Sequence, residues 1–509
     1  MDIIENEDIL IEEEAEPVTE DENDGLKKKK SLSANSFFYL IYTILNVFFP
    51  LATGIYVTRV LFPDTIGSVE TARNLVQYFS ILAFLGIPTY GLREIAKIRK
   101  DKSKLNKLVT ELFIINTIST TVFTLIYIAL IFSVPVYRNN LSLYLITGIA
   151  IILNFFNISW LYEGLEEFKF ISIRNILFKA LAFILLVILV KSESDYLTYA
   201  LITVIGTSGN FILDIMFAPK KVKFTRHELN LKQHMKPIMF LVVVNLAIEI
   251  YSLIDITMLS FMTDSETVAF YSYGAKINKL LLQVVNTFTI VIIPRIAFYY
   301  KEGRKEEYNN LLTNTLLIIV IITIPMIVGI WFVSDYMLTA LYGDAYIRSS
   351  YVLKILCFIL LVSPIGYLLG SRVMLTTENE NKMFIPVTIG AVANIILNAI
   401  LISFYDEKGA AIASLVSEFI ILVVYLYISH KHFKIGKIYP TIIKVLISTL
   451  IMGIVLYLCT LMAISLLWQT IIQIVLAIFT YGLMLIILKE RTIYSFLEKI
   501  KRKVFNHGK

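Results

Sequence analysis

Long apolar stretches recur along the whole of this sequence, and they restrict its fold more than any other feature. About fourteen windows are long enough, at roughly 20 residues each, to cross a hydrocarbon core of about 30 Å as helices. Hydrophobic residues make up 57% of the chain, whereas ordinary soluble domains contain roughly 45–50%. Because a backbone in lipid must satisfy its own polar groups, we predict an all-α integral membrane protein with about 14 transmembrane helices.

The predicted spans are joined by short loops, and two of them form a hairpin around the polar turn 263–266. No loop is long enough for a soluble catalytic domain, and the motifs of phosphate loops, zinc proteases and metal sites are missing. We therefore predict a protein that is not an enzyme and uses no cofactor or metal. The other predicted spans are 37–60, 69–91, 108–132, 141–162, 170–190, 196–217, 311–333, 351–373, 383–404, 409–428, 442–464 and 467–488.

The charges of the loops predict how the chain crosses the membrane. Lys and Arg are concentrated in the loops after the second, sixth, eighth and twelfth spans, whereas residues 62–68 and 263–267 contain neither. Cytoplasmic loops carry the excess of Lys and Arg. We therefore predict a multi-pass protein of the cell membrane with both termini in the cytoplasm. The alternation is weakest at loops 163–169 and 376–382, which are acidic or mixed.

A weak internal repeat predicts two halves, because hairpins with similar turns close on Gly86-Ile87-Pro88 and on Ile292-Ile293-Pro294. Transporters built from such repeats place the substrate between two lobes. We predict two six-helix lobes related by a pseudo-two-fold axis, followed by two C-terminal helices. The predicted divisions are an acidic, disordered cytoplasmic tail ending in a lysine cluster (1–30), the first lobe (31–218), a basic linker (219–236), the second lobe (237–430), the last helix pair (431–489) and an amphipathic basic tail (490–509).

Charged side chains within the hairpin indicate a transport pathway. Glu249 and Asp255 lie in its first span, and Lys276 and Lys279 lie in its second. A charge at the bilayer centre costs about 2.5–3.5 kcal/mol on insertion scales, so such residues face a bundle interior or an aqueous cavity. The acids have two interpretations: they pair with lysines, or they bind a coupling ion in a desolvated site. That ion is either a proton or sodium.

Two segments carry a recognisable pattern. The first contains NVFFPLATGIYVTRVLFPDTIG and GIPTYGLREIAKIRKD, and the hairpin contains SLIDITMLSF, VAFYSYGAKINKLL and IIPRIA. Both resemble the polysaccharide (O-antigen type) repeat-unit flippases of the multidrug/oligosaccharidyl-lipid/polysaccharide exporter superfamily. The resemblance implies MATE-like lobes that face each other in a V and move by alternating access. It also implies an undecaprenyl-pyrophosphate-linked oligosaccharide, flipped from the cytoplasmic to the outer leaflet for surface polysaccharide biosynthesis.

The pyrophosphate implied by this resemblance requires cationic side chains, because Arg and Lys bind phosphate oxygens with charge-assisted hydrogen bonds. Bases outnumber acids in the spans, so we predict a cationic central cavity. Lys276 and Lys279 are three residues apart and share a helix face. Arg59 lies near a helix end, from which it can also reach the interface. The predicted cationic residues are Arg59, Arg73, Arg174, Lys179, Lys276, Lys279 and Lys354.

Five polar residues either contact sugars or join helices through hydrogen bonds: Asn245, Tyr271, Tyr273, Asn394 and Asn398. The predicted partners are the lipid-linked oligosaccharide, the bilayer, and a polysaccharide polymerase with its assembly proteins. We expect no nucleic acid partner and a functional monomer. The alternatives are a lipid II flippase, which needs the same cationic cavity, and a MATE-type multidrug or cation antiporter, which needs an acidic one.

Overall fold

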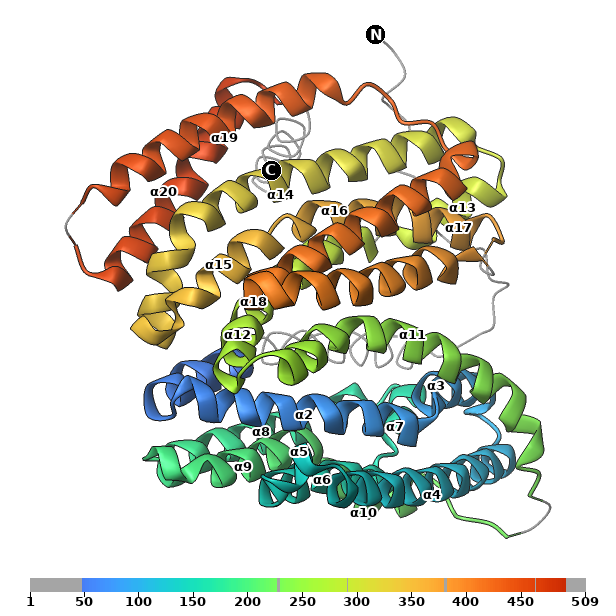
Figure 1. The fold of residues 1–509 in the computed structure, drawn as a ribbon. Coiled ribbons are helices and arrows are strands. Elements are labelled where there is room, and N and C mark those ends of the chain that lie inside the picture. Colours follow the sequence, from blue (N-terminus) through green and yellow to red (C-terminus); the bar gives the residue numbers. More distant parts are fainter. Residues whose placement is uncertain (1–47, 227–228, 291, 380–381, 463, 491–509) are drawn as a thin grey trace, which may run out of the picture.

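The structure is a computed structural model that describes residues 48–226, 229–290, 292–379, 382–462 and 464–490. The side chains of residues 243–245, 247–248, 288 and 290 are not described either. The predicted tail 1–30, residues 37–47 of the first predicted span, and the tail 490–509 apart from Glu490 lie outside these residues. Every regular element among the described residues is helical (Figure 1).

The described residues of the first half of the chain, from residue 48, form the lower bundle in Figure 1. Residues 48–60 are helical. The helices that follow are α2 (Pro63–Phe84), α3 (Ile87–Ile98), α4 (Lys102–Ser133), α5 (Pro135–Arg138), α6 (Leu141–Leu153), α7 (Ser159–Gly164), α8 (Phe168–Leu189), α9 (Tyr196–Ser208) and α10 (Phe211–Phe217). The predicted span 69–91 is interrupted at Leu85 and Gly86, which both have positive φ angles, and Pro88 then lies in the first turn of α3.

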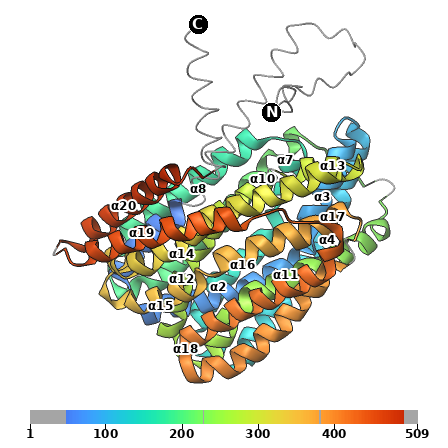
Figure 2. The same ribbon diagram turned by 90° about the horizontal axis from the view of Figure 1, so that it is seen from above.

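The second half forms the upper bundle. Its helices are α11 (Lys232–Met262), α12 (Ser265–Ile290), α13 (Ile293–Lys301), α14 (Lys305–Tyr342), α15 (Ile347–Leu356), α16 (Ile359–Gly366), the π-helical segment Tyr367–Arg372, α17 (Val373–Thr376), α18 (Phe384–Ser429), α19 (Tyr439–Thr460) and α20 (Leu466–Ile487). The first two of these helices, α11 and α12, lie beside α2 between the two bundles (Figure 1). The last two helices pack against each other and against α14 at one edge of the molecule (Figures 1 and 2).

Helix α18 folds back on itself, as the two predicted spans 383–404 and 409–428 require. Asp406 has a left-handed backbone, with φ 47° and ψ −127°, which interrupts the helix. The two pieces are antiparallel, because the Tyr425 hydroxyl donates to the Met383 carbonyl at 3.3 Å and Gly390 faces Ile421. This part of the prediction is confirmed.

Nine helical segments in the described part of the chain are long and apolar enough to cross a membrane. Helices α11 and α12, which carry the four charges of the predicted hairpin, are not among them. Large apolar side chains are exposed along the outer helices, as at Leu125 of α4, Leu450 of α19 and Ile478 of α20. A surface of this kind is suited to lipid and not to water.

The two ends of the molecule are packed differently. At the end that carries the turns 61–62 and 263–264, here called the turn end, one apolar core includes Val57 and Ile66 of the first half and Ala269 and Tyr273 of the second. At the opposite end, here called the basic end, the halves have separate cores: Ile95 and Trp160 belong to one, and Ile296 and Leu368 to the other. The halves are therefore joined at the turn end.

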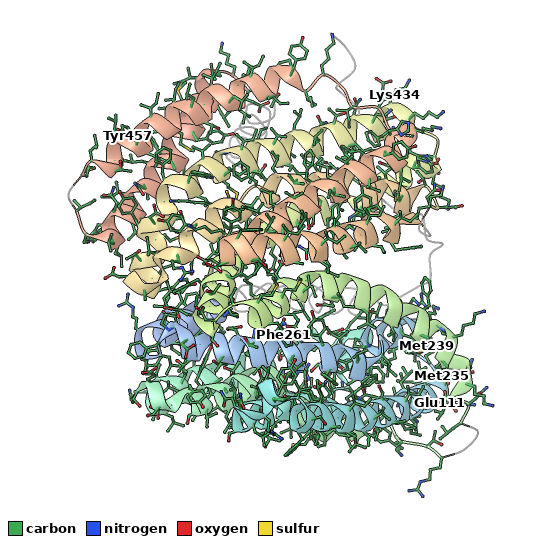
Figure 3. The ribbon with its side chains drawn as sticks, viewed as in Figure 1. Glu111, Met235, Met239, Phe261, Lys434 and Tyr457 are labelled. Carbon is green, nitrogen blue, oxygen red and sulfur yellow. The ribbon has the colours of Figure 1, made fainter. Side chains whose placement is uncertain are left out.

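Helix α11 belongs to both halves. Near the basic end, its Ile238 and Val242 are buried in the core of the first half, whereas Leu259 is buried with helices of the second half. Figure 3 shows Met235 and Met239 at the basic end near Glu111 of α4, with Phe261 far along the same helix. The predicted lobe boundary at 236/237 therefore does not coincide with a break in packing.

Candidate functional site

A buried carboxylate joins cations from both halves of the protein. Oε1 of Glu70 in α2 accepts hydrogen bonds from Arg73 Nη1 at 3.0 Å and from Lys276 Nζ of α12 at 2.8 Å. The Glu70 side chain is 8% exposed, whereas Arg73 and Lys276 are 35% and 32% exposed. The two cations are therefore accessible from a cavity, and the carboxylate lies behind them.

Local structure explains why these three groups meet. Glu70 and Arg73 are one turn apart and share a face of α2. Helices α2 and α12 run closely side by side because Gly67 has no side chain: its backbone lies directly against Ser265 and Ala269. That contact brings Lys276 within reach of Glu70. The Lys276 ammonium also lies 4.5 Å from the centre of the Tyr273 ring, a distance suited to a cation–π interaction.

Two cavities meet at these cations. The larger cavity, of about 540 Å³, lies between α2, α11, α12, α15, α16 and α18. The smaller, of about 180 Å³, lies between residues 49–54, α2, α8, α9 and α12, with a largely apolar lining. Arg73 and Lys276 line both cavities. A ligand bound by these two side chains therefore has space on both sides.

The predicted excess of bases is found in the lining of the smaller cavity, which has Arg73, Lys179 and Lys276 and no acid among the described residues, but not in that of the larger one. The larger cavity is lined by the bases Arg73, Lys276 and Lys279, and by the acids Glu70, Glu249, Asp255 and Glu418. Glu70 was not identified from the sequence, although the spacing of Glu70 and Arg73 within a predicted span is a signal that could have found it. The cations of the cavity come from α2 and α12, whereas Glu249 and Glu418 come from α11 and α18.

Four of the predicted cationic residues line a cavity: Arg73, Lys276 and Lys279 the larger one, and Lys179 the smaller one. The other three line neither of these two cavities. Arg59 is exposed and donates to the Ala340 carbonyl at 2.7 Å. Arg174 is buried in an ion pair with Asp214 of α10. Lys354 donates to both carboxylate oxygens of Asp335 at 2.7 Å. Each therefore has a structural partner away from the cavities.

Asp255 is held by neutral donors. Its carboxylate accepts from the Tyr271 and Ser414 hydroxyls, and from Asn394 Nδ2 and Asn398 Nδ2 at 3.2 and 2.7 Å. The ion pairs of the described residues do not include Asp255, so the predicted pairing with a lysine is wrong for this residue. Glu249 lines the larger cavity and also has no ion pair among the described residues.

The predicted sugar contacts have different positions. Asn394 and Asn398 are fully buried, and their amides join α18 to α11 by donating to Asp255, as in the alternative of helix-joining hydrogen bonds. Tyr271 lines the larger cavity with its hydroxyl engaged by Asp255. Tyr273 lines the smaller cavity and packs edge-on against Tyr342. The side chain of Asn245 lies outside the described residues.

A second buried cluster was not expected from the sequence. His234, at the start of α11, approaches Glu111 Oε2 of α4 at 2.8 Å with one ring nitrogen and the Tyr90 hydroxyl of α3 at 2.9 Å with the other. Both His234 and Glu111 are buried. His234 lies within the predicted basic linker 219–236, and in the structure it attaches α11 to the first half.

Outside the apolar segments, the turn 263–264 has its own charge arrangement. The Thr267 backbone N–H donates to Asp264 Oδ1 at 2.8 Å, which lowers the pKa of this carboxyl, and the nearby Arg348 guanidinium lowers it further. Asp264 therefore begins α12 as an N-terminal cap. No group of three or more His, Cys, Asp or Glu residues within the described ranges could hold a metal ion.

The sequence and the fold match those of known proteins. Residues 32–299 match the family described as "Polysaccharide biosynthesis protein", and residues 241–400 match the family described as "MatE". The "Putative O-antigen transporter" of Escherichia coli (strain K12) is 24% identical over 403 residues, which cover 77% of this chain and 94% of that protein.

Two solved structures share the fold. "Lipid II flippase MurJ" in an inward closed conformation has a TM-score of 0.67 at 18% identity, over 88% of this chain and 97% of that chain. An inward-facing multidrug resistance MATE transporter has a TM-score of 0.60 at 14% identity, over 75% and 93% of the two chains. The predicted MATE-like helical fold is confirmed, whereas the number of 14 spans stays a prediction.

Proposed function

Because this chain belongs to the polysaccharide biosynthesis protein family, we propose that it flips an undecaprenyl-pyrophosphate-linked oligosaccharide from the cytoplasmic to the outer leaflet. One observation carries the proposal: Arg73 and Lys276, from opposite halves of a multi-pass membrane protein, meet where two cavities join. A diphosphate at this point bridges both halves. The wider, more polar cavity then takes sugars, and the smaller apolar cavity lies on the other side of the diphosphate.

The chemistry of the two cations suits a diphosphate. The Arg guanidinium offers a planar set of donors that matches phosphate oxygens, and the Lys ammonium acts as a compact charge. Their hydrogen bonds to an anion are stronger than neutral ones. Amide groups that can bind sugars line the larger cavity, as at Asn74, Gln77 and Asn278.

The distribution of Lys and Arg supports an orientation for the chain. Bases cluster around the basic end, on α3, on the start of α4 and on residues 220–223, whereas the turns 61–62 and 263–264 contain none. Because cytoplasmic loops carry this excess, we assign the basic end to the cytoplasm. The chain termini then lie in the cytoplasm, and the joined halves at the turn end close the outer side.

The surroundings of Asp255 support coupling to sodium. Its carboxylate, the Tyr271 and Ser414 hydroxyls and the Asn398 amide place several oxygens together in a buried site between α11, α12 and α18. The amide oxygen Asn398 Oδ1 is buried with no hydrogen-bond partner in the described structure. Oxygen ligands with a single negative charge suit a hard monovalent cation.

Transport in vesicles distinguishes the coupling residues. Asp255→Asn is expected to remove the dependence of flipping on a sodium gradient. If Glu249→Gln removes it instead, the other predicted acid is the coupling residue. If wild-type flipping follows a proton gradient and ignores sodium, the sodium site is refuted.

Lipid analysis tests the proposed function itself. In cells depleted of the protein, an undecaprenyl-pyrophosphate oligosaccharide is expected to accumulate in the cytoplasmic leaflet while surface polysaccharide falls. Lys276→Gln is expected to reproduce this loss with normal membrane insertion. Lys354→Gln, which removes a lysine outside both cavities, is the matched control. Unchanged lipids together with sensitivity to organic cations would instead establish a cation antiporter.

The proposal also defines the setting in which the protein acts. Its product in the outer leaflet is a substrate for a polysaccharide polymerase and its assembly proteins. The cavities and the Asp255 site lie within one chain, so a monomer contains every group that the proposal uses.

A further inference from the structure

We propose that Glu70 takes the place of the substrate's diphosphate in the unloaded protein, and that a diphosphate opens the turn end by displacing it. This inference rests on the proposed function, because it assumes a diphosphate at Arg73 and Lys276. It adds that the acid between the two cations controls when the halves separate. Glu70 would thus be a positioning residue that acts through its two partners.

The geometry of the three groups supports direct competition. Glu70 uses the single oxygen Oε1 to accept from a cation of each half. A phosphate oxygen accepts from the same donors with the same geometry. The cations are about one-third exposed, whereas the carboxylate is 8% exposed. A diphosphate arriving through the cavity therefore reaches the cations without first moving Glu70, and its several oxygens and larger charge favour it over one carboxylate oxygen.

Displacement leaves Glu70 in an unfavourable position. A buried carboxylate that has lost its cations is strongly destabilising. Glu70 can regain hydration if α2 and α12 separate, because it lies on the face of α2 that is covered by α12. The next turn toward the turn end contains the Gly67 contact and the pair Ser68 Oγ–Ser265 Oγ, 3.1 Å apart. Separation at Glu70 therefore loosens the contacts that close the turn end.

The energetics give the direction of the coupling. A ligand shifts a conformational equilibrium only by its different affinity for the two states. The open state, in which Glu70 no longer holds Lys276, offers free cations and binds the diphosphate more tightly. Weakening the Glu70 contact raises the fraction of protein in the open state, so binding of the diphosphate becomes tighter. Loss of the buried Glu70 carboxylate is then expected to increase the affinity for the diphosphate. A purely structural role for Glu70 does not predict this increase.

Binding to the purified full-length protein in nanodiscs tests this point, with inorganic pyrophosphate and undecaprenyl pyrophosphate as probes. Glu70→Gln is expected to bind both at least about fivefold more tightly than wild type, the lower end of typical allosteric coupling. Glu70→Asp keeps the charge with a shorter reach, so an intermediate increase is expected. Glu418→Gln removes one negative charge from the same cavity without a contact to either cation, and it should increase affinity less.

A crosslink between α2 and α12 reports on the turn end. Cysteines at Ser68 and Ser265 are introduced together, with the buried Cys357 and Cys459 replaced by alanine. Undecaprenyl pyrophosphate is expected to lower disulfide formation at least fivefold in the otherwise wild-type protein. Glu70→Gln is expected to lower it without any ligand, whereas Glu418→Gln should not.

The possible failures have different meanings. If wild type binds pyrophosphate and Lys276→Gln abolishes binding, the proposed site stands. In that case, equal affinities for Glu70→Gln and Glu418→Gln, or a crosslink that ignores the ligand, overturn the role of Glu70 alone. If wild type binds neither probe, the proposed function fails and the inference fails with it.

Discussion

Replacing Gly67 with alanine tests whether the turn end must close during transport. Gly67 of α2 lies directly against α12: an added Cβ would be 1.6 Å from the Ser265 carbonyl oxygen and 3.2 Å from the Ala269 nitrogen. Since Cβ atoms essentially never approach a neighbour within 3.0 Å, α2 and α12 must separate here by at least about 1.4 Å. The obstacle is backbone, so no side chain can turn aside to make room.

The Gly67→Ala substitution destabilises only the conformation in which the turn end is closed. Overpacking a well-packed contact costs about 1–3 kcal/mol, and only the state with the turn end closed contains the contact. The state with the turn end open is unaffected. The ratio of closed to open protein is therefore expected to fall roughly 5- to 150-fold, which is the equivalent of that free energy.

The crosslink between cysteines at positions 68 and 265 measures this ratio. Gly67→Ala is expected to reduce its yield, and to reduce export because a cavity that stays open outside cannot be loaded from inside. Gly329→Ala is the matched control, because an added Cβ at Gly329 of α14 meets nothing within 4 Å. An unchanged crosslink together with normal export would refute the view that this contact closes the outer side.

Three further predictions concern residues outside the cavities. Glu407→Gln should lower the free energy of unfolding by about 3 kcal/mol in a chemical unfolding assay, because Arg348 donates to both oxygens of this buried carboxylate at 3.0 and 2.7 Å. Asp264→Ala should lower the free energy of unfolding by about 1 kcal/mol, because the cap of α12 is lost. The folded state lowers the pKa of Asp264, so this stabilisation is complete above the ordinary carboxyl pKa of about 4 and is lost as the pH falls below that value. Unfolding measured at several pH values will show this dependence. Arg59→Gln should leave pyrophosphate affinity unchanged, since this exposed side chain bonds to the Ala340 carbonyl.

The sequence predicted the helices better than the site, and the reason is physical. A span is recognised from a run of about 20 apolar residues, which is local information. The fold-back at Asp406 and the short turn at residues 263–264 were therefore anticipated from composition. The break at Leu85 and Gly86 was not placed within the predicted span 69–91, because apolar residues continue across it, although Gly86 and Pro88 are residues that favour a break.

The site depends on contacts between distant residues. Glu70 meets Lys276 across 206 positions of the chain, and that contact exists because α2 and α12 approach closely at a glycine. Arg174 and Lys354 show the reverse case. Each is a charge in an apolar span, which suggests a cavity, yet each has an acid partner on a neighbouring helix. A charge within a span therefore predicts a partner or a cavity, and the sequence alone does not distinguish them.

The placement of the remaining acids leads to a last prediction, on substrate selection. Glu70 is engaged by two cations and Asp255 by four neutral donors. Glu418 accepts a hydrogen bond from the Tyr251 hydroxyl at 3.1 Å, and Glu249 has no ion pair among the described residues, so these two acids of the larger cavity keep acceptor capacity for a ligand. They come from α11 and α18, away from the α2–α12 contact at which Arg73 and Lys276 lie. A carboxylate accepts hydrogen bonds from sugar hydroxyls, so this arrangement suits a ligand with a diphosphate at one end and sugars at the other.

The double variant Glu249→Gln/Glu418→Gln is therefore expected to weaken binding of the oligosaccharide-linked lipid about tenfold, the equivalent of roughly 1.4 kcal/mol for two lost charge-assisted hydrogen bonds. Binding of undecaprenyl pyrophosphate alone should not weaken, because that ligand has no sugar to contact these acids. Equal weakening of both ligands would show that the acids act on the whole cavity. Tighter binding of organic cations to wild type than to the double variant, without any effect on the oligosaccharide-linked lipid, would show that they select cations instead.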